Sequence, residues 1–141
     1  MSAEQTLTRL GYAGLIPFVV LTALLWLVDA ELLAFVSLAL GGYAAAIASF
    51  LGGVHWGIGF MQGSAAPRRH FIWGVLPSLV AWLALMMPVH AALPLLALVL
   101  AACYAVDRQS YPTVGLAGHL PMRLRLTVVA TLSCLLGAAA V

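Results

Sequence analysis

Apolar and polar positions divide the chain into long apolar runs separated by short polar segments. Crossing a bilayer as a helix takes about 20 mostly apolar residues. The apolar runs cover residues 10–28, 32–61, 71–87, 91–106 and 124–141. Barrel strands would instead alternate apolar and polar positions over about ten residues. The pattern therefore predicts an all-α, polytopic membrane helix bundle: one domain over 1–141 with five transmembrane helices.

The polar connections predict an orientation for this bundle. Arginine occurs before the first run at Arg9, in the second connection at Arg68 and Arg69, and in the fourth at Arg108 and Arg123. The first and third connections contain none. Because cytoplasmic segments of membrane proteins are enriched in arginine and lysine, we expect the N-terminus to be cytoplasmic and the C-terminus to lie outside.

The composition agrees with a membrane protein and excludes some partners. Apolar residues make up 65% of the chain and charged residues 7%, whereas soluble domains carry about 25% charged residues. The net charge of +2 comes without a basic stripe, so no nucleic-acid partner is expected. The N-terminal segment resembles neither a signal peptide nor a mitochondrial presequence. We therefore predict a multi-pass protein of the bacterial inner membrane.

Small residues recur along the second run. Ala45, Ser49, Gly53 and Gly57 are spaced by four, and Gly52 adjoins this row. Residues four apart share one helix face, and small side chains let helices approach closely in lipid. The row predicts a packing seam, formed either with another helix of this chain or with a second subunit.

One histidine lies in the same run. From Leu32 to His55 a helix rises about 35 Å at about 1.5 Å per residue, which exceeds the hydrocarbon thickness of about 30 Å. His55 is therefore expected near the cytoplasmic boundary. It is either a neutral, hydrogen-bonded structural imidazole or, as intramembrane ionisable residues often are, part of a functional site.

Other polar and aromatic side chains share this depth. An aromatic belt at the interface explains the tryptophans on its own. Alternatively, the whole group forms a cleft open to the cytoplasm, with His55 as hydrogen-bond donor or axial ligand, two tryptophans as walls, and a tyrosine and an aspartate as polar anchors. The candidate ligand-binding residues are Tyr12, His55, Trp56, Trp73, Tyr104 and Asp107.

The sequence contains little that indicates catalysis. It has no nucleophile elbow, no phosphate loop and no zinc-protease motif. The histidines lack the spacing of a metal site, although a weak two-histidine site of His55 and His70 is geometrically allowed. No carboxylates pair within the runs, so an ion-coupled pump is poorly supported. These features favour a non-enzymatic protein without catalytic residues or metal ligands, and they leave any cofactor unknown.

Several segments together resemble a known family. They are "LGYAGLIPF" at 10–18, "SFLGGVHWG" at 49–57, "WGVLPSLVAWLAL" at 73–85, "YAVDR" at 104–108 and "RLRLTVV" at 123–129. In order and spacing they are similar to the transmembrane protein 69-like family of small membrane proteins of unknown function. The resemblance implies five membrane helices in bacterial inner membranes or mitochondria, and it supplies no activity. Its motifs highlight Gly52, Gly53, His55, Trp56, Gly57, Pro77, Asp107 and Arg108.

The chain departs from that pattern near Met122, where an aromatic residue would be expected. The tryptophan-rich sensory protein family, which binds porphyrins and sterols, is similar only in size and helix number.

Two functions remain open from the sequence. The first is an assembly factor or accessory subunit that packs through the small-residue seam against a membrane-protein partner or another copy of itself. The second is a binding module for a small apolar ligand, such as a quinone, porphyrin or lipid, in the cytoplasmic-side cleft around His55. The bilayer is an expected partner in both.

Overall fold

The computed structural model describes residues 1–141 as helices joined by short connections, without any strand. The helices are α1 (Ala3–Ala13), α2 (Leu15–Leu27), α3 (Ala30–Gln62), α4 (Arg68–Leu85), α5 (Val89–Ser110) and α6 (Leu120–Ala140). Short 3-10 turns, η1 (Gly63–Ala65), η2 (Tyr111–Val114) and η3 (Ala117–His119), lie in the connections. The predicted all-α class is confirmed.

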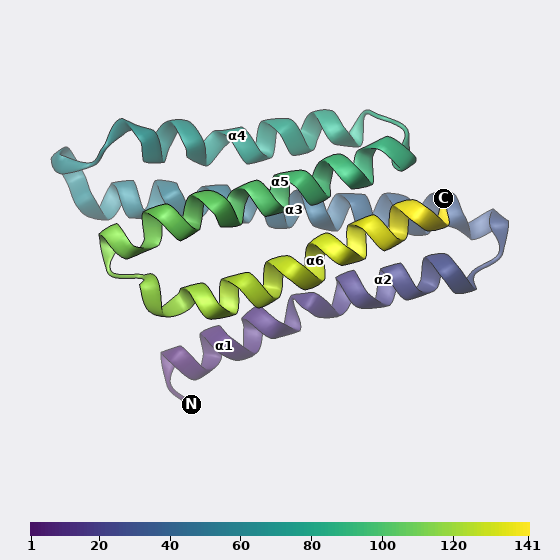
Figure 1. The fold of residues 1–141 in the computed structure, drawn as a ribbon, viewed down its shortest axis with the longest axis horizontal. Coiled ribbons are helices and arrows are strands. Elements are labelled where there is room, and N and C mark those ends of the chain that lie inside the picture. The colour runs from purple at the N-terminus through teal and green to yellow at the C-terminus, as the bar shows by residue number, and fades with distance from the viewer.

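The helices lie roughly parallel to one another along the length of the molecule (Figure 1). The N-terminus, the α3–α4 connection and the α5–α6 connection lie at one end, which we call the N-terminal end. The α2–α3 turn, the α4–α5 turn and the C-terminus lie at the other. In the figure α4 lies along the upper edge of the bundle, and the rod made of α1 and α2 lies along the lower edge.

Four helical segments are long and apolar enough to cross a membrane. They cover Ala3–Leu27, Ala30–Ala65, Val89–Val114 and Ala117–Ala140. The predicted run 71–87 forms α4, which is not among them. This helix begins with Arg68, Arg69 and His70, which lower its apolar character.

The N-terminal rod begins earlier than the predicted 10–28. Ser2 caps α1 by accepting from the Gln5 backbone amide, and the Gln5 side chain accepts from the Ser2 amide in return. This reciprocal cap explains why the polar segment before the apolar run is helical. The rod is interrupted at Gly14 because Pro17 lacks an amide hydrogen and its ring crowds the carbonyl four residues earlier.

Close packing of α3 against α4 depends on glycines. A Cβ atom on Gly52 would collide with the Gly74 carbonyl, and one on Gly59 would come within 2.5 Å of the Phe71 ring. The predicted row behaves differently. Gly53 and Gly57 are exposed, with no atom of this chain within 4 Å of an added Cβ.

Among the other predicted seam residues, Ser49 is exposed and Ala45 is buried. Inside the chain, therefore, α3 packs mainly through the face that carries Gly52, and most of the predicted row points outward.

Candidate functional site

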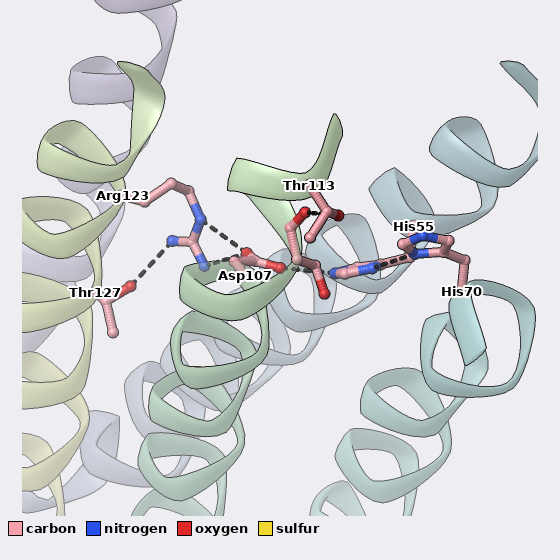
Figure 2. Close-up of polar contacts among 7 residues, drawn as sticks. His55, His70, Asp107, Thr113, Arg123 and Thr127 are labelled. Atoms are coloured by element: carbon pink, nitrogen blue, oxygen red, sulfur yellow. Dashed lines mark hydrogen bonds and ion pairs between the residues drawn. The ribbon is translucent and has the colours of Figure 1, made fainter. Parts of the chain in front are cut away.

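A chain of buried polar side chains crosses the bundle near its N-terminal end (Figure 2). It joins four helices: His70 on α4, His55 on α3, Asp107 on α5, and Arg123 with Thr127 on α6. All five are at most 8% exposed. We call this set the buried polar network.

Asp107 is the centre of the network. Its Oδ1 accepts from Nε2 of His55 at 2.7 Å. Its Oδ2 accepts from Nε and Nη2 of Arg123 at 3.0 and 2.8 Å. Charge-assisted hydrogen bonds of this kind are roughly twice as strong as neutral ones. One carboxylate therefore ties α5 to both α3 and α6.

Arg123 has two further contacts. Its Nη1 donates to the Thr127 hydroxyl at 2.9 Å, one turn along α6. Its guanidinium carbon lies 6.0 Å from the centre of the Tyr104 ring, within the range of a cation–π contact. Arg123, which the sequence analysis assigned to a polar connection, is thus largely buried and lies in the first turn of α6.

The two histidines face each other through their Nδ1 atoms, 3.4 Å apart. Because Nε2 of His55 donates to Asp107, Nδ1 of a neutral His55 is an acceptor, and Nδ1 of His70 is the donor between the rings. That assignment leaves Nε2 of His70 as an acceptor, and this atom is buried without a hydrogen-bond partner.

His70 precedes the apolar part of α4, which begins at Phe71. Burial, with smaller effects from His55 and Arg69, lowers the pKa of His70. The neutral form is therefore favoured in the folded protein.

The remaining predicted residues do not join this network. Trp56 donates through its ring nitrogen to the Phe71 carbonyl at 2.9 Å, so it packs α3 on α4. Trp73 is half-buried against the apolar core. Tyr12 accepts from Arg125 at 3.2 Å on the outer side of α1 and α6. The structure brings together His55 and Asp107, with the Tyr104 ring near Arg123.

A cavity of about 560 Å³ lies beside the network. It is bounded by α1 and α2 on one side, by α3, α5 and α6 on the other, and by the η2–η3 connection at one end, and it is partly open to the outer surface of the bundle. The lining residues are Leu7, Leu10, Gly11, Gly14, Leu15, Phe18, Tyr43, Ile47, Phe50, Leu51, Val54, Leu100, Tyr111, Leu116, His119, Met122, Arg123, Leu126, Thr127 and Ala130.

The cavity lies elsewhere than the predicted cleft around His55. None of the six predicted ligand-binding residues lines it, and His55 is only 1% exposed. The two features meet at Arg123 and Thr127, which belong to the network and also line the cavity. The network therefore forms the polar boundary of an otherwise apolar space.

Local contacts hold the cavity walls in place. The Tyr43 hydroxyl donates to the Gly14 carbonyl at 2.8 Å, at the point where the N-terminal rod is interrupted. The Phe18 and Tyr43 rings meet edge to face at 5.0 Å between centroids. These contacts fix the rod against α3.

One pair within the network has a geometry that also occurs in catalytic sites. The His55–Asp107 pair has the geometry of a base with its orienting carboxylate. However, no serine, threonine or cysteine side chain hydrogen-bonds to His55 as a nucleophile. The free thiols of Cys103 and Cys134 are buried in the apolar core. No group of three or more His, Cys, Asp or Glu side chains comes together to hold a metal ion.

The fold and the long apolar helices define a multi-pass helical membrane protein. The chain belongs to the family described as "Protein of unknown function (DUF3429)", whose profile matches residues 3–139. It is 41% identical over 86 residues to Transmembrane protein 69 of Xenopus tropicalis. The aligned part is 60% of this chain and 34% of that protein, so the match spans about a third of the relative's length. No solved structure matches. The family resemblance predicted from the sequence is confirmed.

Proposed function

We propose that this protein binds a small, lipid-soluble ligand in the cavity between the N-terminal rod and α6. The observation that carries this proposal is the cavity itself, which combines an apolar lining with a buried polar network at one boundary. Sites for small molecules typically have volumes of about 300–1,000 Å³, with apolar walls and a few placed polar groups. The cavity, at about 560 Å³, falls within that range.

The position of the cavity also supports a ligand from the bilayer. Two of its lining residues, Leu10 and Phe50, are 67% and 69% exposed on the outer surface of the bundle. In a membrane that surface faces lipid. A molecule dissolved in the bilayer could therefore reach the cavity without crossing water.

Native mass spectrometry of protein gently extracted from its own membrane tests the proposal. We expect a discrete additional mass at one copy per chain. Leu126→Trp places a large ring in the cavity and should abolish this mass. Leu124→Trp is the matched control because Leu124 is on the same helix, is 45% exposed and does not line the cavity. A wild-type protein without bound mass, or equal binding by both variants, would contradict the proposal.

An accessory-subunit role is the second candidate. It is supported by the outward row of Ser49, Gly53 and Gly57 on α3, which no other part of this chain covers. A membrane helix of a partner subunit could approach α3 closely along this row. Gly53→Leu should then reduce recovery of stoichiometric partner subunits without unfolding the chain. If the variant kept its normal partners, the row would have no role in assembly.

For the membrane arrangement we propose five passes in a bacterial inner membrane, with the N-terminus cytoplasmic. The support is that every arginine belongs to the N-terminal end of the bundle, either in α1 or near the α3–α4 and α5–α6 connections. Apolar residues on the outer face of α4, among them Ile72, Leu79 and Trp82, are more than half exposed. They suit contact with lipid.

A further inference from the structure

The hydrogen-bond donors and the charge at the polar boundary of the cavity restrict the kind of head group that a ligand can have. Two of its side chains matter most, Arg123 and Tyr111, which are 6% and 5% exposed. The Tyr111 side chain lies beside both Arg123 and Asp107. The inference below rests on the ligand-binding function proposed above and concerns the head group of that ligand.

The first argument is the number of hydrogen-bond donors. A guanidinium has five N–H groups and no acceptor. Three of those of Arg123 are used, two toward Asp107 and one toward Thr127. One hydrogen remains on each terminal nitrogen. The Tyr111 hydroxyl lies within hydrogen-bonding reach of Arg123 and Asp107, and it can turn its hydrogen toward a ligand instead. A ligand group at this boundary therefore faces hydrogen-bond donors of Arg123 and Tyr111, and it binds best if it carries an acceptor oxygen.

The second argument is charge. Arg123 is the only formally charged residue that lines the cavity, and Asp107 already compensates it through two hydrogen bonds. An anionic head group would compete with Asp107 for the same guanidinium and would lie close to that carboxylate. Like charges held close together in an apolar setting are strongly unfavourable. A cationic head group would meet no free carboxylate.

The third argument is the shape and lining of the rest of the cavity. Aromatic rings of Phe18 and Tyr43 lie along one wall, and most of the remaining lining is aliphatic. A flat ring with an apolar tail suits such a wall. A phospholipid would bring an anionic phosphate, and a porphyrin would bring carboxylates and require an axial ligand.

We propose that the cavity binds a quinone, with one carbonyl oxygen accepting hydrogen bonds from Arg123 and Tyr111. A quinone is neutral, carries acceptor oxygens on a flat ring, and partitions into lipid through its apolar tail. Binding in this position requires no change in the His55–Asp107 or Asp107–Arg123 contacts.

The test measures binding of a short-chain benzoquinone to purified protein in detergent, by calorimetry and by infrared spectroscopy with a carbonyl-labelled quinone. We expect binding with the carbonyl stretch shifted to lower frequency. Tyr111→Phe should weaken affinity about three- to tenfold, the effect of one hydrogen bond, and reduce the shift. Arg123→Lys keeps a cation for Asp107 but removes the planar fork, and should weaken affinity further.

Thr113→Val is the matched control for loss of a hydroxyl. Thr113 donates to the Ser110 carbonyl outside the cavity, so quinone affinity should not change. Because Tyr111→Phe leaves no buried charge unpaired, it keeps the test decisive even if Arg123→Lys fails to fold.

The outcomes separate the two proposals. If quinone bound and neither Tyr111→Phe nor Arg123→Lys changed its affinity, the head-group assignment would be wrong and the proposed ligand-binding function would still stand. The same titration is repeated with phosphatidylglycerol and with protoporphyrin. The quinone assignment would also fail if either of these bound, if Leu126→Trp abolished that binding, and if the quinone itself did not bind. If none of the three bound and native extracts carried no additional mass, both the assignment and the proposed function would be wrong.

Discussion

At the scale of single residues, Asp107 decides how the buried polar network is balanced. Burying a charge is costly unless it is paired and hydrogen-bonded. Here one carboxylate accepts from a guanidinium and from an imidazole, which leaves neither oxygen without a partner. Replacing both members of a buried ion pair by apolar side chains often costs little stability, whereas removing one member leaves an isolated buried charge. Substitutions of Asp107 and Arg123 should therefore be strongly coupled in their effects on stability.

This coupling gives the first prediction. Asp107→Asn leaves Arg123 as an uncompensated cation and should lower the free energy of unfolding by about 3–5 kcal/mol. Unfolding by dodecyl sulfate in mixed micelles measures the change. Adding Arg123→Gln should recover part of this loss. The double variant should therefore lose less free energy of unfolding than the two single variants lose in sum.

Arg108→Gln is the control for the first prediction. Arg108 is next to Asp107 but exposed, so the change should stay within about 0.5 kcal/mol. Strictly additive effects of the Asp107 and Arg123 substitutions would contradict the coupling.

The second prediction concerns pH and His70. The lowered pKa of His70 means that the folded protein resists taking up a proton that the unfolded chain accepts near the ordinary value of 6.5. Stability from this residue is therefore fully present above about pH 6.5 and is lost as the pH falls. The groups facing His70 are His55 from α3 and, beyond it, Asp107 from α5 and Arg123 from α6.

We expect the midpoint temperature of thermal unfolding in detergent to decrease as the pH is lowered from neutral to about 5.5. His70→Gln should flatten this dependence, because glutamine can still donate to His55 and does not titrate in this range. His90→Gln changes an exposed histidine at the other end of the bundle and should leave the slope as it is. Equal slopes in all three proteins would show that His70 does not control the dependence.

Part of this site was predictable from depth alone. Counting residues along each run placed His55 and Asp107 at one level, and the structure brings them into contact. His70 was considered only as a weak partner of His55 in a two-histidine site, and the structure does bring these two rings together. Arg123 was missed as a site residue because it directly adjoins a polar connection, where charged residues are expected at the surface. The four-residue spacing of Arg123 and Thr127 was the available signal, since it places both on one face of a helix.

At the scale of helices, α3 shows why small residues alone do not identify a packing face. Rows of small residues lie on two faces, one with Ala48 and Gly52 and one with Gly53 and Gly57. In water the buried face would be the apolar one, but in lipid both faces are apolar, so hydrophobicity does not distinguish them. Contact with α4 does: Gly52 meets the Gly74 backbone, and Gly53 meets nothing in this chain.

The third prediction compares these neighbouring glycines. Gly52→Ala forces α3 away from α4 and should cost about 1–3 kcal/mol, as overpacking does in a well-packed core. Gly53→Ala adds the same methyl group to an open surface and should change stability by no more than about 0.5 kcal/mol. Unfolding in mixed micelles measures both. Equal losses would mean that the exposed face is also packed in the isolated protein.

At the scale of the whole molecule, the apolar runs gave the helices to within a few residues, except where connections themselves are helical. The rod α1–α2 and helices α5 and α6 extend beyond the predicted runs because polar segments at their ends continue the helix. The cavity could not have been predicted from the runs, because it depends on how the rod leans against α3 and α6. The polar first turn of α4, with Arg68, Arg69 and His70, distinguishes this helix from the four segments that are long and apolar enough to cross a membrane.

The last prediction tests that crossing and the orientation together. Ser64 is exposed in η1 at the N-terminal end of the bundle, and Met87 is exposed in the α4–α5 turn at the other end. The native Cys103 and Cys134 are buried and should not react. In intact bacterial cells or spheroplasts, a membrane-impermeant maleimide should label Met87→Cys directly, and Ser64→Cys only after permeabilisation. The wild-type protein, unlabelled in both conditions, is the control. Reversed labelling would place the N-terminus outside, and labelling of both positions from one side would show that α4 does not cross.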